Sequence, residues 1–127
     1  DILIPAAIEA TVNCDNVEAI RANLVVEAAN IPITPLADIT LRERGITVIP
    51  DLVANSGGVL ASYYEWVQNL QEFPWEYDTV LQRLEQRLGR VYAQVRDLAQ
   101  QRNTDLRTAA YELAIGRVNR AMALRGF

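Results

Sequence analysis

Residues 46–58 read Ile-Thr-Val-Ile-Pro-Asp-Leu-Val-Ala-Asn-Ser-Gly-Gly, a short β-type run followed by a loop of small and polar residues. The run at 46–49 is rich in apolar residues at consecutive positions, which is typical of a parallel strand covered by helices on both faces. Two similar runs lie upstream, at 2–4 and 24–26. We therefore expect three short buried strands in the first 55 residues.

Helix-like segments lie between these runs, at about 16–22 and 35–44. In the second segment Thr34 stands at the N-cap position, Pro35 at the first helical position and Gly45 just past the end. Strands that alternate with helices through short links indicate a parallel sheet with crossover helices. The sequence thus predicts an α/β fold with about three parallel strands.

Only helical patterns follow Ser56, over 56–70, 78–102 and 104–125. The middle segment has apolar residues at alternating steps of three and four, namely Leu81, Leu84, Leu88, Val91, Val95 and Leu98. This seam is shorter than a coiled coil requires, so packing within the chain is favoured. The last segment is apolar on more than one face, and we expect it to be sandwiched between other elements.

The composition excludes several classes of catalytic and metal-binding site. The 127 residues include 12 arginines, no lysine, no histidine and one cysteine, Cys14. Ser-His and Cys-His nucleophiles, lysine Schiff bases, disulfides and His-based metal sites are therefore excluded. We assign no catalytic residue and no metal ligand. The net charge of −4, without a basic stripe, argues against a nucleic-acid partner.

The beginning of the chain is unusual for a domain. Residues 1–5 enter directly on an apolar run without an initiator Met or a basic segment typical of a signal peptide. No apolar stretch approaches the roughly 18–20 residues of a membrane span, so we expect no membrane partner. We interpret the chain as a piece of a longer protein whose other sheet strands lie upstream.

The loops after the three strands are candidate ligand-binding segments, because parallel α/β sheets bind ligands at the carboxyl ends of their strands. These loops, 5–7, 28–32 and 50–58, are rich in small residues that let a flat ligand approach the backbone. Asn30 and Asn55 supply amide donors and acceptors. Glu27 and Asp51 flank the strand ends, where their carboxylates could bind loop amides, and we assign neither as an acid or base.

The third loop leads into a helix in a way that suits an anion. Asn55 or Ser56 can cap that helix, which leaves the amides of residues 57–59 free to bind a carboxylate or phosphate. Ser62 lies four residues beyond Gly58 and therefore on the same helical face. The same composition is common in turns and caps, so both interpretations remain open from the residues alone.

Several of these stretches, in order along all 127 residues, resemble the glutamate dehydrogenase (Glu/Leu/Phe/Val dehydrogenase) family. They are DILIPAA at 1–7, EAAN at 27–30 with Thr34-Pro35, IPD at 49–51 with ANSGGV at 54–59, SYYEWVQN at 62–69, DLRTAAY at 105–111 and RAM at 120–122. The resemblance implies the second half of an NAD(P)-binding Rossmann-like domain in 1–70. It also implies a C-terminal helical segment, 71–127, that packs on this domain.

The resemblance also implies site residues. Cofactor-binding positions along the nicotinamide ribose would be Pro5, Ala6, Ala7 and Asn30, with Asn55 touching both nicotinamide and substrate. Substrate-binding positions would be Asn55, Gly58, Val59 and Ser62. By this similarity Val59 packs on the aliphatic part of the amino acid, and the Ser62 hydroxyl binds the distal carboxylate of glutamate.

The reaction implied is reversible oxidative deamination of L-glutamate to 2-oxoglutarate and ammonia, with NAD or NADP. Catalytic lysines and an aspartate would lie upstream, as would the glycine-rich pyrophosphate loop, so we expect the chain alone to be inactive. The resemblance further implies a cytoplasmic homo-oligomer, a hexamer. Two alternatives are a branched-chain or aromatic substrate, against which Ser62 argues, and a helical self-association module at 78–125.

Overall fold

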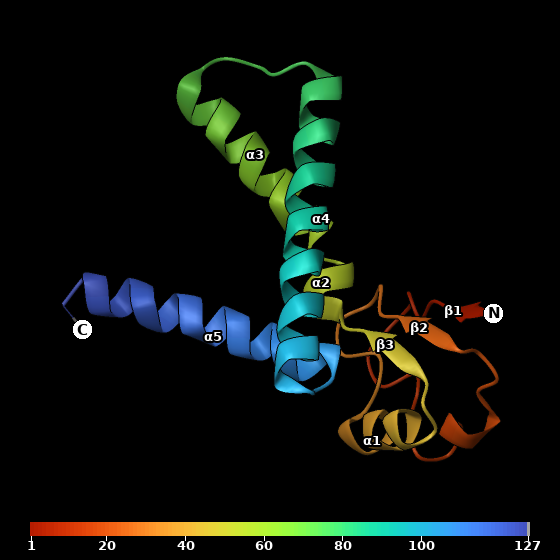
Figure 1. Cartoon of the computed structure of the whole chain (residues 1–127). Helices are drawn as coiled ribbons and strands as arrows, with labels where there is room; N and C mark the ends of the chain where they lie inside the picture. Colours follow the sequence, from red (N-terminus) through yellow and green to blue (C-terminus); the bar gives the residue numbers. More distant parts are fainter. Residues whose placement is uncertain (127) are drawn as a thin grey trace.

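The computed structural model describes residues 1–126. Along the chain it contains β1 (Ile2–Leu3), the 3-10 helix η1 (Val17–Ala19), β2 (Leu24–Val26), α1 (Pro35–Glu43), β3 (Thr47–Ile49), α2 (Asp51–Ala54), α3 (Gly57–Gln71), α4 (Tyr77–Arg102) and α5 (Leu106–Leu124). Figure 1 shows a small sheet at one end, with three longer helices extending from it. The expected α/β class is confirmed.

The three strands form one parallel sheet in the order β1-β2-β3. Leu24 of β2 pairs with Ile2 on one side and with Thr47 on the other. All three strands therefore run in the same direction, and their carboxyl ends reach the same edge. The arrangement is a three-stranded parallel sheet of Rossmann-like type followed by C-terminal helices, in agreement with the expected fold class.

The first crossover differs from the prediction. Instead of a helix over 16–22, the chain forms only the single 3-10 turn η1. The Asn16 side chain accepts a hydrogen bond from the Asn13 amide (2.9 Å) and donates one to the Thr11 carbonyl (2.8 Å). Such local side-chain bonds offer the backbone an alternative to the helical ladder, which explains why the segment stays irregular.

The second crossover, α1, begins and ends close to the predicted positions. Pro35 occupies the first turn, and Gly45 follows the end of the helix with φ +72°, a conformation that glycine adopts without strain. Thr34 is the N-cap residue, but its hydroxyl makes no capping bond. Its carbonyl accepts from the Asp38 amide at 2.9 Å instead. The helix is thus positioned by its backbone and not by a side-chain cap.

Two apolar clusters hold the fold together. The first joins the sheet to α1 and consists of Val12, Val17, Val25, Ile33, Ala37 and Leu41. The second joins α2, α4 and α5 and consists of Val53, Val95, Ala99, Ala109 and Ala110. Ile49 of β3 packs against the second cluster, so the helical segment is anchored directly on the sheet.

The apolar seam of α4 packs inside the chain, as expected. Val91, Val95 and Leu98 contribute to the second cluster. Further along the helix, Leu88 lies against the start of α3, where a Cβ on Gly57 would be 3.5 Å from the Leu88 Cδ1 atom. The seam is therefore largely occupied by the chain's own residues.

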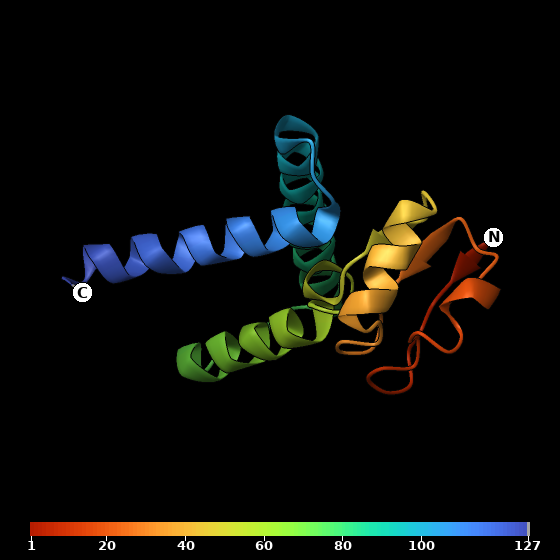
Figure 2. The same cartoon turned by 90° about the horizontal axis from the view of Figure 1, so that it is seen from below.

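The prediction that the last helix is sandwiched is wrong for this chain. Only the beginning of α5 is packed, through the buried Ala109 and Ala110, whereas residues 114–126 are exposed. Figures 1 and 2 show α5 crossing α4 near its first turns and then extending away from the sheet. In the distal half Arg117 still donates to the Gln94 side chain of α4 over 2.6 Å, but none of the described residues after Leu113 is buried. Within residues 1–126, no helix is both long and apolar enough to cross a membrane.

Candidate functional site

The loops at the carboxyl ends of the three strands line one open cleft of about 730 Å³, here called the carboxyl-edge cleft. Its lining residues are Ala7, Ile8, Glu9, Ala28, Ala29, Asn30, Asn55, Gly58 and Val59. The structure thus brings together Ala7, Asn30, Asn55, Gly58 and Val59, five of the residues that sequence reasoning singled out. They come from three segments far apart in the sequence, and the parallel order of the strands explains their convergence.

Two side-chain amides stand in this cleft as a pair. Asn55 Nδ2 donates to Asn30 Oδ1 over 2.7 Å. Each side-chain amide has both a donor and an acceptor. This bond therefore leaves Oδ1 of Asn55 and Nδ2 of Asn30 available for other partners. The pair offers a bound molecule one acceptor and one donor in a fixed relation.

Pro5 and Ala6 are placed differently from Ala7. Pro5 is buried, and its carbonyl accepts from the amides of Ala28 (3.1 Å) and Ala29 (2.9 Å). Pro5 therefore ties the first loop to the second and does not line the cleft. Ala6 is exposed and also lies outside the lining.

The beginning of α3 does not have the expected side-chain cap. Ser56 is already helical (φ −67°, ψ −7°), and its hydroxyl donates back to the Val53 carbonyl over 3.0 Å. Asn55 is occupied by Asn30. The short helix α2 runs almost directly into α3, so neither side chain is free to turn onto the α3 amides. The first backbone amides of α3 still have no carbonyl one turn earlier in their own helix, as at any helix N-terminus.

Val59 and Ser62 lie on the exposed side of α3. Val59 lines the cleft with 78% of its surface exposed, which leaves its methyl groups free for a partner. Ser62 is exposed one turn beyond Gly58 and outside the residues that line the cleft. A molecule that reaches Ser62 must extend past Val59 along the helix.

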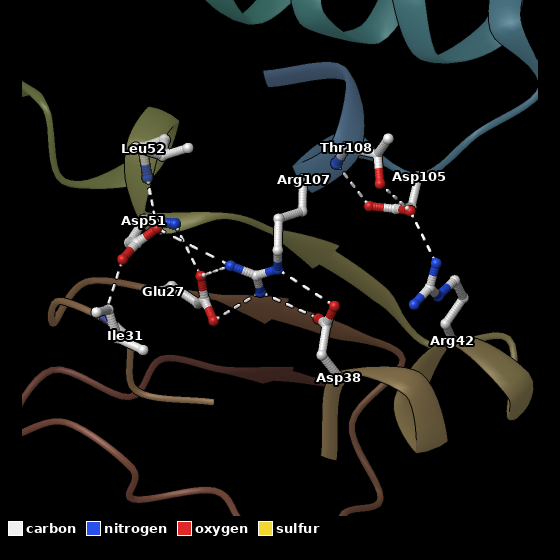
Figure 3. Close-up of polar contacts among 9 residues, drawn as sticks. All are labelled: Glu27, Ile31, Asp38, Arg42, Asp51, Leu52, Asp105, Arg107 and Thr108. Carbon is white, nitrogen blue, oxygen red and sulfur yellow. Dashed lines mark hydrogen bonds and ion pairs between the residues drawn. The ribbon is translucent and has the colours of Figure 1, made fainter. Parts of the chain in front are cut away.

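Sequence reasoning missed Arg107, although it found two of its partners. The Arg107 network consists of Arg107, Glu27, Asp38 and Asp51 (Figure 3). Arg107 donates to both Glu27 oxygens over 2.8 and 2.9 Å and to both Asp38 oxygens over 3.0 and 3.2 Å. The available signal was Glu27 itself, because a carboxylate directly after a buried strand requires a cationic partner.

The interaction between Glu27 and Asp51 agrees with the expectation that both bind loop amides. Glu27 Oε2 accepts from the Asp51 amide over 2.8 Å, and Asp51 Oδ2 accepts from the Ile31 amide over 2.8 Å. Burial lowers the pKa of Arg107, but the hydrogen bonds and charges of Glu27 and Asp38 outweigh it and raise this pKa above its ordinary value. Arg107 therefore stays charged beneath the cleft-forming loops.

A second polar cluster fixes the beginning of α5. Asp105 accepts from the Thr108 amide (2.9 Å) and hydroxyl (2.8 Å) and pairs with Arg42 at 3.0 Å. Burial raises the pKa of Asp105, yet the Thr108 bonds and the Arg42 charge together hold it below its usual value. Asp105 is therefore an ionised N-cap at the beginning of α5.

These features define an α/β protein with a Rossmann-like parallel sheet and a small-residue cleft at the carboxyl edge, where proteins of this class bind their ligands. The family model for Glutamate/Leucine/Phenylalanine/Valine dehydrogenase matches residues 1–126, and the chain belongs to that family.

Similar proteins give the same assignment. The chain is 50% identical over 126 residues to the glutamate dehydrogenase of Thermotoga maritima, covering 99% of this chain and 30% of that protein. A hetero-hexameric glutamate dehydrogenase from Thermus thermophilus in a Leu-bound form superposes with a TM-score of 0.95 at 40% identity, over 99% of this chain and 30% of that one. The glutamate dehydrogenase of Peptoniphilus asaccharolyticus gives 0.90 at 44% identity, over 97% and 31%. The chain thus spans about 30% of the length of these relatives.

Proposed function

We propose that the chain forms the nicotinamide and substrate side of the cleft in an NAD(P)-dependent glutamate dehydrogenase. The reaction proposed is the reversible oxidative deamination of L-glutamate to 2-oxoglutarate and ammonia. The observation that carries this proposal is the meeting of Ala7, Asn30, Asn55, Gly58 and Val59 in one cleft. Membership of the family supports it independently.

In this proposal residues 1–70 are the second half of the cofactor-binding domain, and 71–127 are a helical segment packed on it. The second apolar cluster supports such a division, because it seats α4 and α5 on α2 and β3. We further propose a homo-oligomer, a hexamer, located in the cytoplasm. The cofactor proposed is NAD or NADP.

The residues of the cleft fit the nicotinamide half of such a cofactor. Ala7, Ala28 and Gly58 leave space beside the backbone, and the Asn30–Asn55 pair offers the donor and acceptor that a ribose hydroxyl or a carboxamide needs. The bound cofactor would supply the hydride acceptor. The part of this chain is to hold and orient it, and Pro5 and Ala6 would contribute through the backbone of the first loop.

Substrate recognition is assigned to the start of α3. Val59 would cover the aliphatic part of glutamate, and the hydroxyl of Ser62, one turn further on, would donate to its distal carboxylate. A hydrogen bond that only a distal carboxylate can complete discriminates against substrates without that group. Because the chain has no lysine or histidine, we propose that proton transfer is carried out by residues elsewhere in the protein.

The test is the Ser62→Ala variant of the full-length protein. We expect the specificity constant kcat/KM for glutamate to fall about 100-fold, since a lost hydrogen bond to a charged group costs about 1.5–3 kcal/mol, while residual activity on leucine is unchanged. The matched control is Ser56→Ala, whose hydroxyl is already bonded to the Val53 carbonyl. Equal losses in both variants, or no loss in Ser62→Ala, would contradict the assigned role.

The same assay decides between the substrate classes. Steady-state rates of the full-length protein with glutamate, leucine and phenylalanine, followed by NAD(P)H absorbance, should show preference for glutamate. Preference for leucine or phenylalanine would instead support the branched-chain or aromatic alternative. The isolated 127-residue chain should give no glutamate-dependent signal. For the α4 part of the segment 78–125, packing of Val91, Val95 and Leu98 within the chain argues against the self-association alternative.

A further inference from the structure

We propose that Arg107 is a positioning residue for the cofactor-facing amides. Its guanidinium would act through Glu27 and Asp51 to fix the loop that carries Asn30 and the turn that carries Asn55. This inference rests on the proposed function, which assigns the side chains of Asn30 and Asn55 to cofactor binding. It assigns to the first turn of α5 a control over a cleft that α5 does not line.

The first step is the burial of Glu27. Its side chain is fully buried, and an isolated carboxylate in such a place is strongly disfavoured. Three donors satisfy it, namely Nη1 and Nη2 of Arg107 and the backbone amide of Asp51. Because Arg107 supplies the compensating charge, the Glu27–Asp51 bond depends on the presence and geometry of the guanidinium.

The second step leads from Asp51 to the second loop. Asp51 is held on one side by Glu27 and lies 3.9 Å from Nη1 of Arg107. On the other side, its Oδ2 accepts from the Ile31 amide over 2.8 Å. Figure 3 shows this order of contacts, with Glu27 and Asp51 between Arg107 and Ile31. Asp51 therefore transmits the position of the network to the residue that follows Asn30.

The third step is the conformation of Ile31. Its φ of +46° is an outlier for a β-branched residue, and such a strained conformation persists only where the surroundings hold it. The side chain is 62% exposed and gains little from packing. Two hydrogen bonds hold the backbone of Ile31. The Asp51 carboxylate accepts from the Ile31 amide, and the Ile31 carbonyl accepts from the Ala10 amide at 2.9 Å.

The fourth step connects both amides of the cleft. The Asn55 amide donates to the Asp51 carbonyl over 3.1 Å, and the Asn55 side chain donates to Asn30. Asp51 is thus bonded to Asn55 itself and to the residue after Asn30. A shift of Asp51 would therefore displace Asn30, through Ile31, and also Asn55. For this reason the Arg107 network fixes the position of the Asn30–Asn55 pair.

The test uses the full-length enzyme with Arg107→Lys, which keeps the charge but loses the planar fork that binds two carboxylates at once. We expect the KM for the cofactor to rise about tenfold, because a displaced binding group weakens cofactor binding. The KM for glutamate should rise by a smaller factor, because Asn55 is the only substrate-binding position that the network holds, whereas Val59 and Ser62 lie outside it. The control is Arg42→Lys, since Arg42 pairs with Asp105 in the same region but contacts neither Glu27 nor Asp51.

Two further readouts separate positioning from a structural role alone. Hydrogen exchange of the Ile31 and Asp51 amides should accelerate in Arg107→Lys and stay unchanged in Arg42→Lys. In addition, Ile31→Gly in the Arg107→Lys background should recover most of the cofactor KM, because glycine adopts the required φ without support. If Arg107→Lys does not fold, Asp51→Asn is the substitute. The two carboxylate oxygens of Asp51 accept from the backbone amides of Ile31 and Leu52, whereas asparagine has a single side-chain oxygen to accept from both.

The proposal is overturned if Arg107→Lys lowers the melting temperature but leaves both the cofactor KM and the Ile31 exchange rate unchanged. Failure of the proposed function would look different. In that case the wild-type enzyme would oxidise no glutamate with NAD or NADP, while the exchange rates would still report whether Arg107 controls the loop.

Discussion

The part of the molecule around the sheet encloses its own core, whereas the distal parts of α3 and α5 leave their apolar residues uncovered. Val25 and Leu41 are fully buried between the sheet and α1. Trp66 on α3 and Ile115 on α5 are 56% and 55% exposed. All of these residues sit in comparable apolar patterns in the sequence. What separates the two regions is whether another element of the same chain lies opposite.

The periodicity of apolar residues predicts a helix and its apolar face, but it does not predict which element covers that face. On α4 the prediction of internal packing is confirmed, because α2, α3 and α5 meet it. On α5 the prediction of a sandwiched helix is wrong, because only its first turns reach the second apolar cluster. The mutations below test the contrast, beginning with the largest expected effect.

The contrast is tested most directly by truncating one aliphatic side chain in each region. Leu41→Ala should lower the free energy of unfolding by about 2–5 kcal/mol, because it leaves a cavity in a fully enclosed core. Ile115→Ala should change it by less than about 0.5 kcal/mol, because the side chain is largely solvated already. Urea denaturation of the 127-residue chain measures both. Similar losses would mean that the distal half of α5 is packed in solution.

The anchored beginning of α5 provides the second test. Asp105→Ala should lower the free energy of unfolding by about 1 kcal/mol at neutral pH, the usual cost of losing an N-cap. Because the pKa of Asp105 is lowered in the folded state, the charged form stabilises the fold above the ordinary value of 3.8. This contribution is lost as the pH falls through the folded-state pKa.

The difference between wild type and Asp105→Ala should therefore shrink in denaturation experiments between pH 7 and about pH 3. The control is Glu112→Ala, which removes the exposed ion pair with Arg102 and should cost less than about 0.5 kcal/mol. A difference for Asp105→Ala that stays constant over this range would show that the charge contributes nothing to the cap.

The sequence predicts the architecture better than it predicts the polar contacts. The strands follow from short apolar runs, and α1 follows from Pro35 and Gly45, because these signals are local. The convergence of Ala7, Asn30 and Asn55 also follows, since it depends only on parallel strand order. The side-chain cap predicted for α3 does not form, because Ser56 donates to the nearby Val53 carbonyl and Asn55 donates to the distant Asn30.

Arg107 shows why the remaining part of the site escapes prediction. Its three carboxylates lie between 56 and 80 positions away in sequence, and nothing near residue 107 indicates that its side chain turns toward the sheet. The helix-like segment predicted at 16–22 fails for the opposite reason. The segment does connect β1 to β2, but local hydrogen bonds of the Asn13 backbone and the Asn16 side chain compete with helix formation, and only η1 forms. Contacts of long range and bonds of very short range are both invisible to periodicity.

The smallest predicted effect concerns the strained loop at the edge of the enclosed region. Ile31→Asn should raise the free energy of unfolding by about 0.5 kcal/mol, because asparagine tolerates a positive φ far better than a β-branched residue and little apolar burial is lost. The control is Ile8→Asn, at a site of similar exposure (70%) that lacks a positive φ, where we expect no gain. Thermal denaturation of both variants measures the difference. If Ile31→Asn left the stability as unchanged as Ile8→Asn, the loop would relax in solution, and the Asp51–Ile31 hydrogen bond would not stabilise a strained conformation.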